Sequence, residues 1–552
     1  MTALAEPRLA GTAAARGGPF TGTGVLLRFM LRRDRIRLPA WVLGLTLLMT
    51  YFATALDTLL KTEEDLAGFS QFAGSPAGAM FGGPGFGFDA LTIERFLAGQ
   101  YGLYIVTGAG LMALLTVVRH TRVEEQAGRT ELVRANVLGR HAQLTAALAL
   151  AGLMAALLSL LITGVMAGRG YDAAGSLTFG ASVGACALAV AGITAVAVQV
   201  SEYSRGASGI AGAALGGAFV LRALGDMAHV QGSGPSWLSW LSPIGWSQQA
   251  APYTLDRWWP LLLSVALAAV AAAVGFRLSA RRDVGAGLAP PRPGPRRAAR
   301  WLNSPLTLAF RLHRASVTGW SSAVLVGGVA YGSFTQALLD GFEDAPEDLV
   351  AVMGGSEDLL NGYLGLMGLM WAFITTAYAI LAVQTLRSEE SEGRTEPVLA
   401  TAVSRPAWLG SHLVVIGVTA AWLLLLAGLG DGLGAAVSTG DASLFGDVLL
   451  GHVAHTPAVW LVLALAALLY GAVPRALLLV WVAVGYGAVV GFFGPVLGLP
   501  DTALSVSPFE HVGEYPAEDL GIAAITVPCG LAVAVGACAI AAYRRRDITT
   551  GA

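Results

Sequence analysis

Long apolar stretches alternate with short polar segments along the whole chain. A helix needs about 20 mostly apolar residues to cross the hydrocarbon core of a membrane. In the first half, stretches of that length cover residues 38–58, 97–118, 143–166, 177–200, 207–228 and 258–278. In the second half they cover residues 319–339, 360–383, 409–430, 448–470, 476–497 and 520–542. The pattern predicts an all-α integral membrane protein with about twelve transmembrane helices.

Composition and the placement of charge support this prediction and add an orientation. Hydrophobic residues make up 55% of the chain and charged residues 13%, against about 25% charged in ordinary soluble proteins. Cytoplasmic connections are enriched in Lys and Arg, and arginines gather in residues 28–37, 119–140, 277–300 and 544–546. Residues 340–358 are acidic and contain no basic residue. We therefore expect a multi-pass protein with both termini in the cytoplasm.

The two halves of the chain repeat one another. Residues 122–140 read RVEEQAGRTELVRANVLGR and residues 387–405 read RSEESEGRTEPVLATAVSR, so both follow R-x-E-E-x-x-G-R-T-E-x-V-x-A-x-x-x-x-R. The same offset aligns Ser242-Pro243 with Ser507-Pro508. An offset one residue smaller aligns Arg281-Arg282-Asp283 with Arg545-Arg546-Asp547. Six helices per copy give both copies the same orientation, so we expect two parallel six-helix repeats.

The predicted domain organisation follows from this duplication. We expect a cytoplasmic tail over residues 1–24, the first transmembrane repeat over 25–284 and the second over 304–552. Residues 285–303 are rich in Pro, Gly and Arg, which is typical of an extended linker, here on the cytoplasmic side.

A charged segment that is repeated suggests a repeated contact with another molecule. The candidate docking residues are Glu124, Glu125, Gly128, Arg129, Thr130 and Glu131 in the first copy and Glu389, Glu390, Gly393, Arg394, Thr395 and Glu396 in the second. The glutamates are spaced for a short helix, and the glycine permits a tight turn. The alternative is a surface turn that is merely stabilised by acids near a helix start and arginines near lipid phosphates.

The motif Glu-Glu-x-x-Gly-Arg-Thr-Glu with its downstream arginine resembles the type 2 ABC exporter permeases. In that family the connection between spans two and three forms a coupling helix that contacts the ATPase subunit. The duplication and the sequence FMLRRDRIRLPAW before the first span look like the actinobacterial permeases of the polyketide antibiotic (tetronasin) exporter group. The second segment departs from the first, with Arg405-Pro406 in place of Arg140-His141, so we expect unequal docking surfaces.

The resemblance implies further features. It implies location in a bacterial cell membrane, two copies of a separate ABC ATPase docked on one permease chain, and an amphipathic helix before the first span. Residues 26–38 fit that helix, and residues 306–317 would be its second copy.

The chain carries no phosphate-binding loop of its own. Such a loop, G-x-x-x-x-G-K-[ST], uses its lysine to neutralise phosphates, and the only lysine here is Lys61, in KTEED. We therefore expect no enzymatic activity and no cofactor on this chain, with ATP and Mg bound by the partner ATPase. The formal net charge of -2 gives no indication of a nucleic-acid partner.

Ionisable residues inside the apolar stretches are candidate functional sites, because a charge at membrane depth is costly. Arg222 and Asp226 lie one helical turn apart, either as a structural ion pair or as a contact to substrate. His452 and His455 could share a helix face but lack further ligands, so we expect no metal site and histidines that bond water or backbone. Gln199 lies at the cytoplasmic end of the fourth stretch, where snorkelling or helix packing explains it, so we do not expect it to be a functional site.

Three classes of function remain to be compared. The leading hypothesis is the membrane subunit of an ATP-driven exporter that moves a hydrophobic drug or polyketide antibiotic outward and so confers resistance. The alternative is an ion-gradient-coupled carrier, which would need carboxylates in mid-span, and we expect the stretches to be almost free of these. A membrane-embedded enzyme would need a convergent set of His, Asp, Glu or Cys, and no such set stands out.

Overall fold

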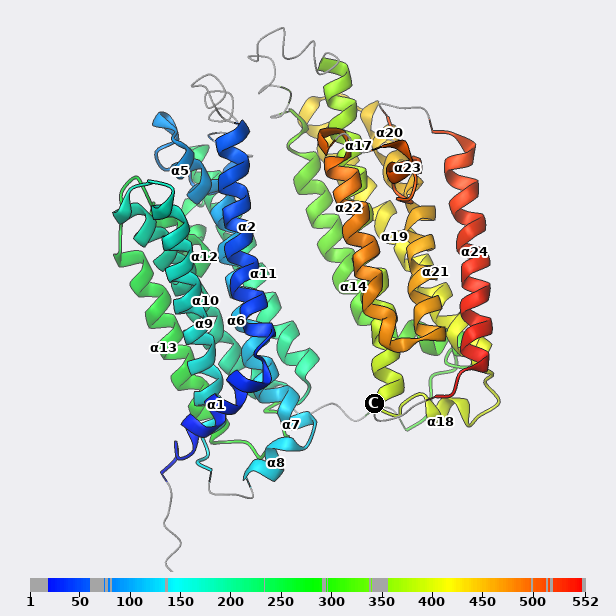
Figure 1. Cartoon of the computed structure of the whole chain (residues 1–552), viewed down its shortest axis with the longest axis horizontal. Helices are drawn as coiled ribbons and strands as arrows, with labels where there is room; N and C mark the ends of the chain where they lie inside the picture. The colour runs from blue at the N-terminus through cyan, green and yellow to red at the C-terminus, as the bar shows by residue number, and fades with distance from the viewer. Residues whose placement is uncertain are drawn as a thin grey trace, which may run out of the picture. The chain divides into compact units, whose positions relative to one another are not determined.

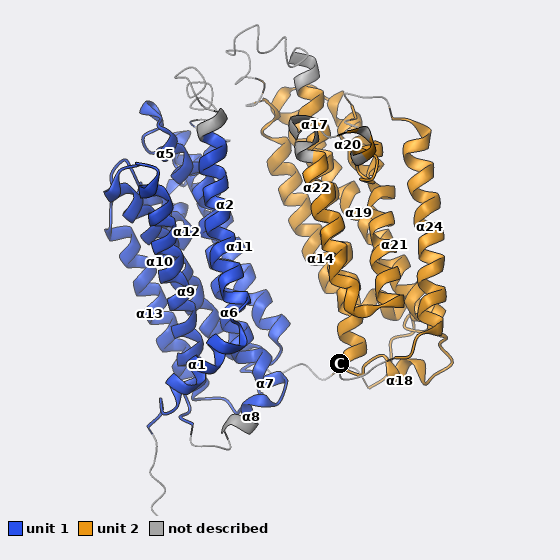
Figure 2. Cartoon of the chain, viewed as in Figure 1, with its two compact units in different colours: residues 1–293 blue, residues 294–552 orange. Residues whose placement is uncertain are grey.

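A computed structural model describes residues 18–59, 74, 78–79, 82–134, 138–232, 234–289, 294, 296–336, 339, 356–497, 500–512, 515–516 and 520–548. These parts of the chain are helical and contain no β-strand. The chain divides into two compact units, unit 1 (Met1–Pro293) and unit 2 (Gly294–Ala552), shown in Figure 2. The division falls inside the predicted linker. The prediction of an all-α integral membrane protein is confirmed.

Unit 1 is built around one central helix. Its helices are α1 (Thr23–Arg33), α2 (Arg37–Leu59), α5 (Ile93–Phe96), α6 (Gly102–Val118), α7 (Glu124–Gln126), α8 (Arg129–Arg134), α9 (Ala142–Gly168), α10 (Ala173–Val200), α11 (Ser204–Val230), α12 (Pro243–Gln249) and α13 (Trp259–Ser279). Two π-helical turns join α5, α6 and α7 into one long span. Because α10 is rich in Ala and Gly, the neighbouring backbones of α6, α9, α11 and α13 approach it closely.

Unit 2 is also helical in its described residues, but its contacts are divided between two helices, α19 and α21, in place of one central helix. The helices of unit 2 are α14 (Pro305–Gly332), α17 (Ser356–Ser391), α18 (Glu396–Leu399), α19 (Arg405–Thr439), α20 (Leu444–Ala454), α21 (Thr456–Ala472), α22 (Val480–Leu497), α23 (Asp501–Leu504) and α24 (Ile522–Arg545). α14 packs along α19, and α24 packs along α21. Figure 1 shows α18 at the end of unit 2 where α24 finishes.

The described residues contain eleven helices that are long and apolar enough to span a membrane, six in unit 1 and five in unit 2. The predicted span over residues 319–339 corresponds to α14, which has the length but not the hydropathy. Serine and threonine residues lower the mean hydropathy of α14. Their hydroxyls bond inside the helix: Thr318 donates to the Arg314 carbonyl (2.9 Å) and Ser322 to the Thr318 carbonyl (3.0 Å). Such internal bonds reduce the cost of polar groups in lipid.

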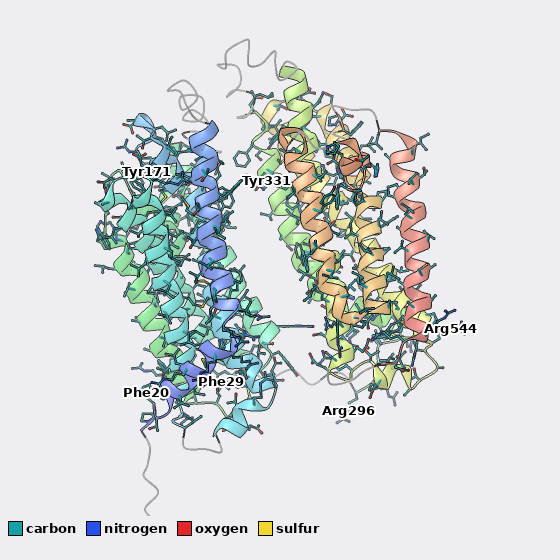
Figure 3. All side chains as sticks on the ribbon, viewed as in Figure 1. Phe20, Phe29, Tyr171, Arg296, Tyr331 and Arg544 are labelled. Carbon is teal, nitrogen blue, oxygen red and sulfur yellow. The ribbon has the colours of Figure 1, made fainter. Side chains whose placement is uncertain are left out.

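The predicted amphipathic helix before the first span exists in unit 1 as α1. Met30 of α1 packs against Ala146 and Leu150 of α9. Figure 3 shows Phe20 and Phe29 at this end of unit 1 and Tyr171 at the opposite end. In unit 2 the equivalent residues are the first part of the continuous helix α14.

Residue 34 gives the physical reason for this difference. Asp34 caps α1 and is buried, where Arg119 binds its carboxylate through two hydrogen bonds of 2.7 and 2.8 Å. Burial would raise the pKa of Asp34, but the hydrogen bonds and charge of Arg119 outweigh burial and hold that pKa below its usual value. The aligned residue of unit 2 is Ala315, which favours an uninterrupted helix.

Most of the acidic stretch 340–358, the tail up to residue 17 and Lys61 lie outside the described residues. The predicted orientation of the chain therefore stays a prediction.

Candidate functional site

The two repeated segments, segment 1 (residues 122–140) and segment 2 (residues 387–405), turn in the same way. In segment 1, helix α7 ends just before Gly128, which has a φ of 68° and donates its amide to the Glu125 carbonyl at 3.0 Å. Segment 2 ends α17 near Gly393, which has a φ of 73° and donates to the Glu390 carbonyl at 3.0 Å. A left-handed residue after a helix is most easily a glycine, which explains why both copies carry glycine at this position.

The second glutamate of each segment is buried and held by a distant arginine. In unit 1, Arg282 donates to the two carboxylate oxygens of Glu125 at 2.7 and 2.9 Å, and Arg122 donates to the same carboxylate at 2.8 Å. In unit 2, Arg546 donates to the two oxygens of Glu390 at 2.8 and 2.6 Å. The glutamate side chains are only 6% and 5% exposed. Two sequence landmarks, the segment and the Arg-Arg-Asp motif, thus meet in both units.

The surroundings of the two ion pairs differ. Arg282 also donates from Nε to Gln199 Oε1 at 2.6 Å, so Gln199, not expected to be a functional site, supports this pair. In unit 2 the Tyr470 hydroxyl donates to Glu390 at 2.6 Å. Arg546 lies over the rings of Tyr470 and Tyr543, 5.3 and 5.2 Å from their centroids. Aromatic faces attract a cation, so they replace the polar support of unit 1.

The first glutamate of each segment pairs within the segment itself. Glu124 accepts from Arg129 Nε at 2.7 Å, and Glu389 accepts from Arg394 Nε at 2.7 Å. Glu124 also accepts from Arg33 of α1 at 2.5 Å, which ties segment 1 to the amphipathic helix. These pairs neutralise the exposed Arg129 and Arg394.

The third glutamate of each segment points outward. Glu131 lies in the first turn of α8 and Glu396 begins α18, and both are exposed. Neither has an ion-pair partner among the described residues. Thr130 and Thr395 beside them are buried, and Thr130 accepts a hydrogen bond from Gln143 at 3.2 Å. Of the predicted docking glutamates, Glu131 and Glu396 are therefore the ones that another protein could reach.

Arg222 and Asp226 form the predicted pair inside unit 1. Both are fully buried, and Arg222 Nη1 lies 3.5 Å from Asp226 Oδ2. The same nitrogen donates to Gln248 Oε1 at 3.2 Å and to the Ala79 carbonyl at 3.4 Å. Arg222 thus ties α11 to α12 and to the segment before α5. These contacts favour the structural alternative over a contact to substrate.

One buried carboxylate was missed by the sequence prediction. Asp431 of α19 is 2% exposed, and its Oδ2 lies 2.7 Å from Nε2 of His452 on α20. The expectation that the spans are almost free of carboxylates therefore has an exception at this position, in addition to the already predicted candidate Asp226. The signal was a lone aspartate in the apolar run LLLLAGLGDGLG. As expected, His455 bonds to backbone, with Nδ1 2.9 Å from the Gly451 carbonyl.

No cluster of three or more His, Cys, Asp or Glu side chains able to hold a metal occurs in the described parts of the chain.

Comparison with known proteins agrees with this architecture. The family described as "Multidrug efflux system permease Rv1217c, C-terminal domain" matches residues 26–278 and 302–544, one stretch in each half of the chain. The "Multidrug efflux system permease protein Rv1217c" of Mycobacterium tuberculosis (strain ATCC 25618 / H37Rv) is 37% identical over 563 residues, which cover 99% of both chains.

Proposed function

The chain belongs to the Rv1217c multidrug efflux permease family, and from that premise we propose that it is the membrane subunit of an ATP-driven ABC exporter. ATP and Mg would bind to a separate ATPase, two copies of which would dock on segments 1 and 2. The cargo would be a hydrophobic drug, with polyketide antibiotics of the tetronasin type as the narrower proposal.

The observation that carries this proposal is the repetition of one docking geometry. Each segment exposes one glutamate in the first turn of a short helix. The other two glutamates of each segment form ion pairs within their own unit. A negative charge at a helix start interacts favourably with the helix dipole, and both glutamates remain exposed to a partner. Two such sites on one chain suit two copies of a partner that presents a basic surface.

Reversing the two exposed charges tests the docking. Glu131→Arg plus Glu396→Arg is expected to weaken binding of the ATPase encoded beside the permease by at least roughly tenfold, because facing like charges cost several kcal/mol. Binding is measured by co-purification and by titration in lipid nanodiscs. Asp89→Arg, an exposed acid at the other end of the second span, is the control and should bind normally. Unchanged binding of the double variant would show that segments 1 and 2 are not part of the interface with the ATPase.

A second candidate function is supported by one observation. The buried pair of Asp431 and His452 is a carboxylate inside a membrane span, which an ion-gradient-coupled carrier requires. Intramembrane acids of this kind often carry protons. Replacement of Asp431 by Asn therefore distinguishes the two candidate functions.

A further inference from the structure

The last arginine of each segment contacts the end of the same helix, α13 or α24, to which the buried glutamate of that segment is bonded. Arg405, which ends segment 2, donates from Nη1 to the carbonyl oxygens of Arg546 at 2.6 Å and Arg544 at 3.3 Å. Arg140, which ends segment 1, donates to the carbonyl oxygen of Ala280. The last carbonyls of a helix lack intrahelical donors, so these arginines satisfy the C-terminal ends of α24 and α13.

Each segment is therefore fastened twice to the last span of its own unit. We call this arrangement the two-point clamp, formed by Glu125, Arg140 and Arg282 in unit 1 and by Glu390, Arg405 and Arg546 in unit 2. Arg546 is the capping residue of α24, and Arg282 follows the end of α13 closely. These contacts hold each segment close to the end of the last span of its unit.

The clamp is the same in both units although its surroundings have changed. In unit 1 the side-chain amide of Gln199 contacts the pair, whereas in unit 2 the hydroxyl of Tyr470 does so. A buried ion pair is weak evidence for stability, because apolar packing of the same volume often stabilises as much. A forked arginine, however, fixes the orientation of its partner through two parallel hydrogen bonds. Both units therefore keep the same orientation of glutamate and arginine, although the groups around the pair differ.

The clamped spans are also the least buried of the eleven candidate spans. Only 22% of the α13 window and 17% of the α24 window are buried. Each packs chiefly against one neighbour, α10 or α21. A span that is packed on one side only can be displaced with less disruption of its unit than a span enclosed by several neighbours.

We propose that Arg282 and Arg546 are positioning residues that make each last span move together with its docking segment. This rests on the proposed function, because the docked ATPase would supply the force. Closure of the ATPase would displace the segment, and the clamp would carry that displacement into α13 and α24. The neighbouring spans, which are packed on several sides, would stay in place.

The test compares coupling with binding in the complete complex. Arg282→Lys plus Arg546→Lys keeps both charges but removes the fork. In proteoliposomes containing the permease and its ATPase, we expect normal ATPase binding and basal ATP hydrolysis. The ethidium transported per ATP should fall by about tenfold, in line with the loss of a charge-assisted bidentate contact. The control is Arg281→Lys plus Arg545→Lys, the exposed neighbours in the same motifs, which should transport normally.

A purely structural role gives a different result. If the fork variant unfolds at a lower temperature but its folded fraction moves as much ethidium per ATP as wild type, the proposal is overturned.

A second measurement works without the ATPase. Spin labels on Glu396→Cys and Arg544→Cys report the distance between segment 2 and the end of α24, where Figure 3 shows Arg544. Cys529→Ser and Cys538→Ser remove the unburied native cysteines. We expect a narrow distance distribution that broadens when Arg405→Ala and Arg546→Ala are added. If it does not broaden, the clamp is refuted. If it broadens but no ATPase ever binds wild type, the proposed function fails and the clamp stands.

Discussion

Arg222→Met should greatly reduce the amount of folded protein in the membrane, because the free energy of unfolding should fall by about 3–5 kcal/mol. The reason is the charge left behind: Asp226 is fully buried in α11 and would lose its cation. The variant would also lose the bonds from Arg222 to Gln248 and to the Ala79 carbonyl, so α12 would detach from α11. Thermal unfolding of the purified protein in lipid measures the loss.

Two further variants separate the possible causes. Arg222→Met combined with Asp226→Leu removes both charges and should recover most of the lost stability, since replacing a whole buried pair by apolar groups is often neutral. Arg205→Met changes an exposed arginine on the same helix and should have little effect. If Arg222→Met instead folds normally and only transport is lost, Arg222 contacts the substrate and the structural role is wrong.

Gly332→Leu should separate α14 from α19 and prevent unit 2 from folding. A Cβ atom at residue 332 would lie 2.1 Å from the carbonyl oxygen of Asp431 and 2.7 Å from its Cα. Overpacking against side chains costs about 1–3 kcal/mol, and we expect a larger loss here because backbone atoms cannot rotate away. The same displacement should break the contact between Asp431 and His452.

The measurement is the yield of monodisperse protein after extraction, followed by its unfolding temperature. Gly319→Leu provides the matched control on the same helix, since nothing lies within 4 Å of its Cβ position. Equal yields of the two variants would show that α14 and α19 do not pack at this distance.

The sequence predicted the spans well because their signal is local. An apolar run of the required length is visible without knowledge of any neighbour, and all the predicted stretches correspond to helices. The exception in hydropathy, α14, is informative. Gly328 and Gly332 of α14 lie against the backbone of α19, and this close packing competes with hydropathy in the choice of residues.

The clamp could be only half predicted. The repeats of the segment and of Arg-Arg-Asp were visible in the sequence, but contact between them joins residues more than a hundred positions apart. Nothing in the local pattern of either motif indicates the other. The burial of Glu125 and Glu390 was likewise hidden, because a glutamate between two polar residues looks exposed.

The pair of Asp431 and His452 was hidden for another reason. Each residue was visible as a polar group in an apolar run, but their meeting depends on how α20 returns along α19. Such a pair is specified by tertiary packing and not by spacing. The same holds for Gln248, which contacts Arg222 from a different helix.

Transport in proteoliposomes that contain the permease, with and without its ATPase, tests most directly whether ATP drives this protein. We predict that ethidium moves only when the ATPase and Mg-ATP are both present, and that Asp431→Asn leaves the dependence on ATP intact. If an imposed proton gradient drives transport without the ATPase, and Asp431→Asn abolishes that transport, the protein is an ion-gradient-coupled carrier and not an ATP-driven exporter.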